Sequence, residues 1–420
     1  MSWSILNLAK HIFGFTSSAF DVGSDIANSM NFLGFFNYNT TYSSITSLAL
    51  TSLTQPITSN TTMRLSATSE MSLCATTDER EDLIWGIFSL LIVFLPGFIF
   101  GTTMTIQFIL EDDWSYLFLF TVFAIPIISV GFPLLFLWYQ LLIIVRIWRN
   151  DGIDKLKTPI TQFLGFEATV ESTPQLLLQL FTIFNGYQST LVQEVAIAAS
   201  FFQIARCSIL NDIETKIAIV HGEELSFKDS LLSTMYRLPM YASTIIFRVG
   251  SLAITMAYFR YLSLIPIAIL LVTQTMIAWT RYKKLRSAIG NTKQLTFLLV
   301  ASNIGAVNAL PPGSQNAEED QNVVQFIKNS TLASFIHHSA LLIFIMTVAY
   351  IFPDAMNHWS SSCNFRLKPG THAFWGVFGV VFLMGIFSLT TILYRARLMV
   401  KIGSKPLPAP IFYKDLELLN

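Results

Sequence analysis

The chain has few charged residues. Of its 420 residues, 12% are charged and 53% are hydrophobic, and the mean hydropathy is +0.55. An average soluble domain carries about 25% charged residues, so this composition excludes an ordinary soluble fold. The 26 basic and 26 acidic residues cancel, which leaves no basic face to neutralise nucleic-acid phosphates. We therefore expect a membrane protein that does not bind nucleic acid.

Cysteine is scarce, and catalytic motifs are missing. Cys74, Cys207 and Cys363 are too few and too scattered for a zinc site, which needs about four clustered ligands. His337 and His338 are neighbours, and adjacent residues on a helix point about 100° apart, which suits a shared metal poorly. The sequence has no nucleophile elbow, Walker loop, HExxH motif or Gly-rich dinucleotide fingerprint. We expect no enzymatic activity, no metal and no cofactor.

Long apolar segments dominate the chain instead. A membrane span needs roughly 20 mostly apolar residues, and about eight segments qualify. They are residues 10–37, 83–110, 161–185, 190–218, 241–260, 262–280, 331–352 and 373–397. The first of these carries two aspartates where a cleavable signal peptide would be uninterrupted, so we expect it to be retained as a helix.

Two further apolar stretches fit a single span poorly. Residues 117–148 are long and are interrupted at Pro126, Gly131 and Pro133, and residues 294–310 are short and end at a Pro-Pro pair. Both patterns predict half-membrane re-entrant helices. The predicted fold is all-α, a polytopic transmembrane helical bundle with about eight spans plus these two re-entrant helices, in one domain over residues 1–420.

Basic residues near the span ends predict the orientation, because basic loops stay cytoplasmic. Three clusters decide it: Arg146, Arg149, Lys155 and Lys157; Arg281, Lys283, Lys284 and Arg286; Arg395, Arg397 and Lys401. All are cytoplasmic if both termini are, provided the first proline-broken stretch is a hairpin. Residues 38–82 then form an outer loop with glycosylation sequons at Asn39 and Asn60. Residues 311–330 form a flexible cytoplasmic loop, and residues 401–420 a short cytoplasmic tail.

The first predicted helix contains two acidic residues. Asp21 and Asp25 are four residues apart and therefore share one helix face. A charge at mid-bilayer costs at least about 2.5 kcal/mol on insertion scales, so such residues normally face a polar interior or a partner. One interpretation is a functional site; the other is that this helix end lies near the membrane interface.

A polar stripe follows in the 161–185 segment. Its members recur every four residues, which places them along one side of a helix. They are Glu167, Glu171, Gln175 and Gln179. Pro174 has no amide proton to donate, so it frees the carbonyl of Val170 and is expected to kink the helix within the stripe. Freed backbone at membrane depth is tolerated in protein or beside a wet cavity, so the stripe fits a hydrophilic path.

Two arginines lie inside predicted spans and are candidate partners of these acids. Arg206 falls in the 190–218 segment and Arg248 in the 241–260 segment, each between apolar residues. Buried polar groups also hold helices together. Structural pairing and a transport path are compatible interpretations, and the residues alone leave both open.

Three motifs resemble the XK-related family of membrane proteins. They are Glu-Ser-Thr-Pro-Gln-Leu at residues 171–176, Asp-Val-Gly-Ser-Asp at 21–25 and Phe-Arg-Val-Gly-Ser-Leu-Ala at 247–253. The resemblance implies ATP-independent phospholipid scrambling, with phosphatidylserine exposure, along charged residues within the membrane. It implies path or path-supporting roles for Asp21, Asp25, Glu167, Glu171 and Arg248, with Gln175 and Gln179 on the same stripe and with Arg206, whose surroundings match poorly.

The chain also departs from that family. Members activated in apoptosis carry a caspase site in a terminal tail, and the tails here contain no Asp-x-x-Asp sequence. Cys74 and Cys363 fall in predicted outer loops, where oxidation is permitted. They are candidates for a disulfide with each other or with a partner, since in one family member a cysteine of the last outer loop bonds a partner protein. A single-pass membrane partner or a homo-oligomer would fit, and the plasma membrane is the expected location.

Two other classes of function use the same residues. An ion or solute channel or transporter would employ the acidic side chains as cation sites. A non-transporting scaffold would use them to hold a membrane partner. Each of these needs buried charges, so the resemblance is what places phospholipid transport first.

Overall fold

The computed structural model describes residues 2–33, 84–99, 125–149, 168–185, 191–220, 227–270, 317–352 and 367–403, together with residues 102, 272, 273 and 276. Every regular element in this part of the chain is helical, which confirms the all-α prediction. The elements are α1 (Ser2–Phe32), a short helix (Ile84–Ile99), α5 (Ile125–Trp148), the π-helix η2 (Ala168–Ser172), α7 (Thr173–Phe184), α8 (Leu191–Val220), α9 (Phe227–Phe259), the 3₁₀-helix η3 (Arg260–Ser263), α12 (Ala317–Ile351) and α14 (His372–Gly403).

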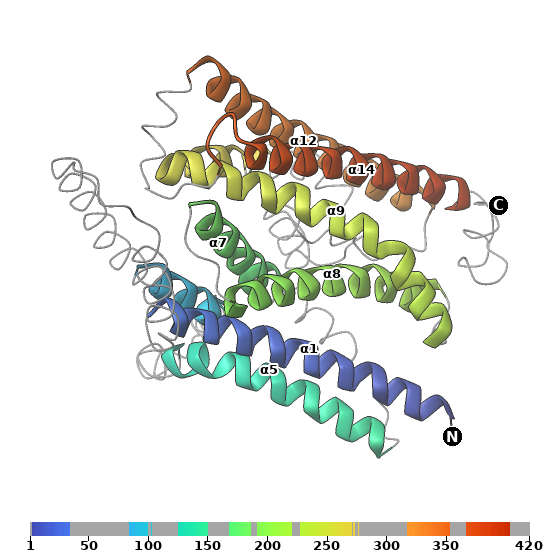
Figure 1. The fold of residues 1–420 in the computed structure, drawn as a ribbon. Helices are drawn as coiled ribbons and strands as arrows, with labels where there is room; N and C mark the ends of the chain where they lie inside the picture. The colour runs from blue at the N-terminus through green and yellow to red at the C-terminus, as the bar shows by residue number, and fades with distance from the viewer. Residues whose placement is uncertain are drawn as a thin grey trace, which may run out of the picture.

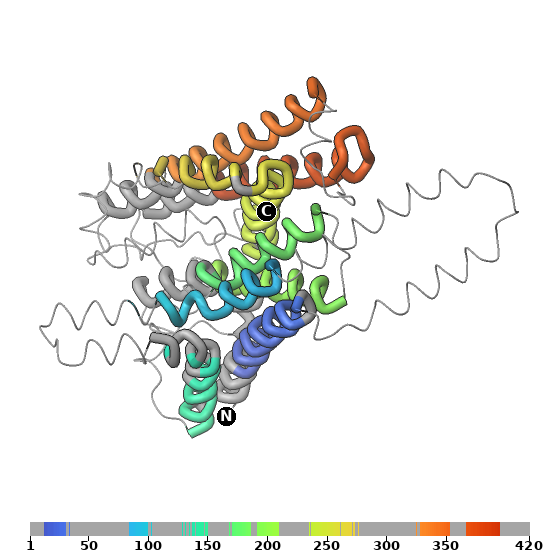
Figure 2. The backbone as a smooth tube through the Cα atoms, turned by 90° about the vertical axis from the view of Figure 1, so that its left-hand side faces the viewer, coloured from blue at the N-terminus to red at the C-terminus, as the bar shows by residue number. Residues whose placement is uncertain are grey.

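The helices stack in layers around α9 (Figure 1). The α12 and α14 helices pack on each other and on one side of α9, while α7 and α8 pack on its other side. The α1 helix contacts both α8 and α5, so it lies between them, and α5 is outermost on the side opposite α12 and α14 (Figure 1). Figure 2 shows the same separation after a quarter turn. Pro239 lies inside α9, where proline removes one backbone hydrogen bond and bends a helix.

Three of the described helices are long and apolar enough to cross a membrane. They contain Arg237–Phe259 of α9, Lys328–Ile351 of α12 and His372–Tyr394 of α14. The α9 segment is mostly buried, whereas the other two mostly face outward. The outer face of α14 exposes Trp375 and Leu383 among other large apolar side chains, and exposed apolar surface of this extent is characteristic of a membrane contact. The protein is therefore membrane-embedded.

The structure corrects two boundaries predicted from the sequence. Residues 125–148 form one uninterrupted helix, so the predicted break at Gly131 and Pro133 does not occur. Proline inside a membrane helix is tolerated when neighbouring groups satisfy the freed carbonyl. The α12 helix begins at Ala317, within the predicted loop 311–330. The sequence Ala-Glu-Glu-Asp starts this helix, and acidic residues near a helix N-terminus favour it through the helix dipole.

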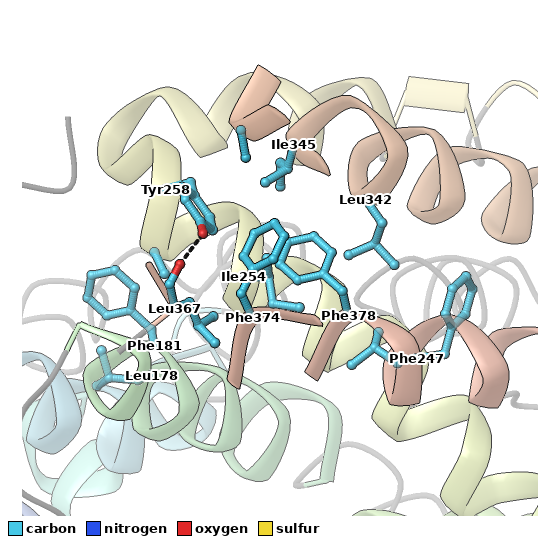
Figure 3. Close-up of a cluster of buried hydrophobic side chains, with 13 residues drawn as sticks. Leu178, Phe181, Phe247, Ile254, Tyr258, Leu342, Ile345, Leu367, Phe374 and Phe378 are labelled. Carbon is cyan, nitrogen blue, oxygen red and sulfur yellow. Dashed lines mark hydrogen bonds between the residues drawn. The ribbon is translucent and has the colours of Figure 1, made fainter. Parts of the chain in front are cut away.

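A large apolar core lies between α7, α9, α12 and α14 (Figure 3). It includes Leu178 and Phe181 of α7, Ile254 of α9 and Phe374 and Phe378 of α14. The rings of Phe374 and Phe378 are 4.5 Å apart between centroids. Such contacts are attractive beyond their buried area, so this half of the bundle is held by close apolar packing.

One polar contact closes this core at its edge. The hydroxyl of Tyr258, near the end of α9, donates to the backbone carbonyl of Leu367. Four residues later Thr371 accepts a hydrogen bond from the amide of Phe374 at 3.2 Å, which makes Thr371 the N-cap of α14. Gly370, between them, has φ 83°, a conformation that favours glycine. The start of α14 is thereby fixed against α9.

We expect Tyr258→Phe to lower the stability of the protein by about 1–2 kcal/mol, because it leaves the Leu367 carbonyl without its donor and keeps the ring contacts. Thermal unfolding in detergent would measure the loss. Tyr350→Phe is a matched control, since Tyr350 is on the outer surface of α12 and 81% exposed. Equal melting temperatures for the two variants would contradict the proposed role of this hydrogen bond.

Candidate functional site

The α1 helix presents a polar face to the protein interior. Ser18, Asp21, Asp25 and Asn28 are spaced by three, four and three residues, so they lie along one side of the helix. All four are buried, and Asp21 and Asp25 are 1% and 0% exposed. The two carboxyl groups therefore face protein partners, which is how ionisable groups in membrane helices are normally accommodated.

Asp21 is hydrogen-bonded by a residue just before α7. The hydroxyl of Ser172, in η2, donates to Asp21 Oδ2 at 2.9 Å. Arg206 of α8 lies within electrostatic reach of the same carboxyl group. The guanidinium also donates to the carbonyl of Gly14 at 3.0 Å and to Gln203 Oε1 at 3.2 Å. Arg206 is one of the two arginines that the sequence suggested as partners of the acidic residues. It links α8 to α1 on the acidic face.

Asp25 is held one turn further along. Gln179 of α7 donates from Nε2 to Asp25 Oδ1 at 3.2 Å, and the Ser200 hydroxyl of α8 lies 3.4 Å from the same oxygen. Ser200 also interacts with the Asp21 carboxyl group. A single serine thus contacts both carboxyl groups, so Asp21 and Asp25 are close together in space as well as on one helix face.

The polar stripe is buried, but its backbone differs from the predicted one. Glu171 belongs to the π-helix η2 and is 2% exposed, while Gln175 and Gln179 belong to α7 and are fully buried. Pro174 is the second residue of α7, where missing an amide proton costs little. A junction of π-helix and α-helix lies just before Pro174, and π-helical turns accompany helix kinks. The kink itself stays a prediction. The Thr173 hydroxyl satisfies the carbonyl of Ala168 at 2.7 Å.

Hydrogen bonds extend this arrangement to six of the described helical elements. Gln140 of α5 and Gln203 of α8 both donate to Ser18 Oγ at 3.1 Å. Gln175 donates to Ser89, which lies 2.8 Å from Ser29 of α1. We call these hydrogen-bonded residues, together with Asn28 on the same face of α1, the buried polar cluster. Its members are Ser18, Asp21, Asp25, Asn28, Ser29, Ser89, Gln140, Ser172, Gln175, Gln179, Ser200 and Gln203.

Several buried atoms of the cluster have no hydrogen-bond partner among the described residues. They are Asp21 Oδ1, Gln175 Oε1, Gln179 Oε1 and both amide atoms of Asn28. A buried polar group left without a partner costs about 1–3 kcal/mol. Buried groups in this state are uncommon and call for an explanation such as a ligand or a functional role.

Arg248 belongs to a second polar region, between α9 and α12. Its side chain is 3% exposed, and its charge acts on His338 of α12. The ring nitrogen Nδ1 of His338 is 2.6 Å from the hydroxyl of Ser251, one turn after Arg248. The sequence motif around Arg248 therefore helps join α9 to α12. The hypothesis that Arg248 is the counter-ion of the acidic residues stays a prediction.

Some predicted residues lie outside the described part of the chain. They are Glu167, Asn39, Asn60, Cys74 and Cys363. Cys207 is 2% exposed within α8, where cysteine packs as a small apolar residue.

Sequence reasoning missed eight of the twelve members of the cluster. Asn28 continues the spacing of Asp21 and Asp25 by one turn, so a helical projection of the first segment would have found it. Ser200 and Gln203 share a face of the 190–218 segment, but nothing in their own sequence distinguishes them from ordinary polar residues of a membrane helix. Only the packing of α8 on α1 brings them to the acidic face.

Comparisons with protein-family models, with curated proteins and with solved structures found no match. Within the described residues, no group of three or more histidine, cysteine, aspartate or glutamate side chains has the arrangement to hold a metal ion. The functional interpretation therefore depends on the geometry of the cluster and on the motifs in the sequence.

Proposed function

We propose that this protein moves phospholipids between the two leaflets of a membrane without an energy source. The headgroup would travel along the polar residues of α1, η2, α7 and α8 while the acyl chains stay in the bilayer. The observation that carries the proposal is the buried polar cluster. It unites the acidic motif of α1 with the polar stripe of α7, two of the three motifs that resemble the XK-related family.

Physical chemistry explains why such residues would help a lipid cross. The main barrier is removal of the headgroup from water, and protein charges and dipoles can replace part of its hydration. The described conformation is closed, since Asp25, Gln175 and Gln179 are fully buried. Transport would require α1 to separate from α7 and α8. Each hydrogen bond between them contributes about 1 kcal/mol. Breaking these few bonds therefore adds only a small free-energy cost to the conformational change.

The family resemblance also guides the expected setting. We propose the plasma membrane, with both termini cytoplasmic, and phosphatidylserine exposure as the physiological result.

Cation transport is a second candidate. It is favoured by the two adjacent carboxyl groups of Asp21 and Asp25 in a membrane helix bundle, because intramembrane acids also mark ion pathways. This candidate predicts ionic currents through planar bilayers that disappear with the carboxylates, without lipid movement.

The test is exchange of fluorescent lipids in liposomes that contain the purified protein. Wild-type protein should equilibrate tail-labelled lipid between the leaflets. The double variant Asp25→Asn, Glu171→Gln should be slower by at least about tenfold, since loss of one charged interaction of about 1.4 kcal/mol already gives a factor of ten. Glu194→Gln makes the same chemical change at an exposed residue of α8 and should leave the rate unchanged.

Three outcomes would overturn the proposal. Wild-type liposomes without lipid exchange would exclude scrambling, and the bilayer recording then decides whether ions move instead. An unchanged rate in the double variant would exclude these acids from the path. Purification as a stoichiometric complex that moves neither lipid nor ions would identify a scaffold.

A further inference from the structure

The hydrogen bonds of the buried polar cluster leave an excess of acceptors. Gln175 and Gln179 use their Nε2 groups to donate to Ser89 and Asp25, but their Oε1 atoms accept no hydrogen bond from any described residue. Asp21 accepts from Ser172 on Oδ2 and has no hydrogen-bond partner on Oδ1 among the described residues. In this part of the chain the cluster therefore has more acceptors than donors, and Arg206 supplies the positive charge near Asp21.

Asn28 gives an independent indication of a missing ligand. Its side chain is 0% exposed, and neither of its amide atoms has a hydrogen-bond partner in the part of the chain that the structure describes. It follows Asp25 by three residues and Asp21 by seven, so it lies on the same face of α1 as both carboxyl groups. A polar side chain that is completely buried without partners beside two carboxyl groups marks a place where a further polar group fits chemically.

We propose that the buried polar cluster binds the primary ammonium group of a phospholipid, as carried by phosphatidylethanolamine and phosphatidylserine. This inference rests on the proposed function and names its preferred substrates. An ammonium group carries three N–H donors and one positive charge. It thus complements the carboxyl groups of Asp21 and Asp25 and the amide oxygens of Asn28, Gln175 and Gln179.

Phosphatidylcholine would bind less well at this site. Its quaternary ammonium has no N–H donor and is typically recognised by the faces of aromatic rings. The members of the buried polar cluster are serine, aspartate, asparagine and glutamine, which offer oxygen acceptors instead. The chemistry of the cluster therefore favours headgroups with a primary amine over choline headgroups.

The ammonium group would enter when α1 separates from η2 and α7. That movement breaks the contacts of Ser172 with Asp21 and of Gln179 with Asp25, which are 2.9 Å and 3.2 Å long. The acceptors that lack partners make the closed arrangement less favourable than a fully bonded one. An amine headgroup supplies the missing donors in the open arrangement, so the lipid with the complementary headgroup lowers the cost of opening.

The experiment measures a ratio of rates in one kind of vesicle. Liposomes with purified full-length protein carry trace amounts of tail-labelled phosphatidylethanolamine, phosphatidylserine or phosphatidylcholine. We expect wild-type protein to move the two amine lipids at least about threefold faster than phosphatidylcholine. On a scale of 1.4 kcal/mol per factor of ten, this ratio corresponds to a preference of about 0.7 kcal/mol. The ratio does not depend on how much of the protein is folded, since all lipids meet the same active fraction.

Two isosteric variants shift the charge of the cluster in opposite directions. Asp21→Asn removes a negative charge and should bring the ratio close to one. Asn28→Asp adds a negative charge and should raise the ratio above the wild-type value. Opposite changes from substitutions of nearly equal volume would not arise from a general loss of stability.

Each outcome has a definite meaning. Equal wild-type rates for the three headgroups overturn the ammonium site and leave lipid transport standing, whereas no movement of any lipid overturns the transport function itself. Slowing of amine-lipid transport by added ethanolamine, but not by tetramethylammonium, supports a site that also accepts a free amine. An intact preference without slowing by ethanolamine supports an amine presented by the lipid alone. If sodium stabilises the protein and the three headgroups move at equal rates, the cluster binds a metal cation and the inference is overturned.

Discussion

Replacing Gly385 with alanine is expected to destabilise the protein by about 2–3 kcal/mol, through overpacking of the contact between α9 and α14. A Cβ atom at this position would lie 2.4 Å from Cδ2 and 2.5 Å from Cε2 of Phe247. The Phe247 ring is 3% exposed, and its centroid is 5.5 Å from the rings of both Phe335 and His338. The ring therefore has little room to move aside, and the helices must separate instead.

The same helix provides a matched control. Gly379 has open space where its Cβ would be, so Gly379→Ala should be neutral or stabilise the helix by up to about 1 kcal/mol. Thermal unfolding in detergent would compare the two variants. Phe247→Leu should recover part of the loss caused by Gly385→Ala, since neighbouring substitutions are not additive. Similar melting temperatures for the two glycine variants would show that α9 and α14 do not meet at Gly385.

Replacing Gln179 with leucine is expected to cost about 1–2 kcal/mol. It removes a donor from a buried carboxyl group, and the loss of the Gln179 Oε1 acceptor, which has no partner among the described residues, offsets part of that cost. Gln179 Nε2 lies 3.2 Å from Asp25 Oδ1, and both residues are completely buried. Leucine has a similar size, so the loss would reflect the missing hydrogen bond. Thermal or denaturant unfolding of the purified protein would measure it.

A double-mutant cycle separates this effect from a general packing defect. With Asp25→Asn in place, the carboxyl charge is gone and Gln179→Leu should cost at least about 1 kcal/mol less than in the wild type. Gln325→Leu, at an exposed position of α12, should change stability by no more than about 0.5 kcal/mol. Additive losses in the cycle would mean that Gln179 and Asp25 do not interact.

Helix positions followed well from the sequence where apolar residues continue without a break. The predicted segment 190–218 corresponds to α8, Leu191–Val220, and the segment 373–397 begins within one residue of α14. The prediction was wrong at Gly131 and Pro133, within α5. The sequence shows which backbone group proline removes, but whether a neighbouring group replaces it depends on tertiary packing.

The sequence predicted which site residues share a helix face, but not which helices pack together around them. The spacing of Asp21 and Asp25 placed both on one face of α1, and the structure has that face buried. The approach of Ser200 and Gln203 depends on how α8 packs against α1, and single polar residues in a membrane helix carry no signal of their partner. The predicted roles of Glu167, Arg248 and the outer cysteines stay predictions.

The π-helix η2 sets the direction in which Glu171 points. In a π-helix each amide bonds to the carbonyl five residues before it, so the turn holds one residue more than an α-helical turn. Each residue of an α-helix turns the chain by about 100°. If Ala168–Ser172 changed to α-helical bonding, the residues of η2 would rotate relative to Gln175 and Gln179. Glu171, four residues before Gln175, would then lie on the same side of a continuous α-helix as both glutamines. A shift of one residue in backbone register, without any change of side-chain rotamer, would therefore change the direction of the Glu171 carboxyl group relative to these two amides.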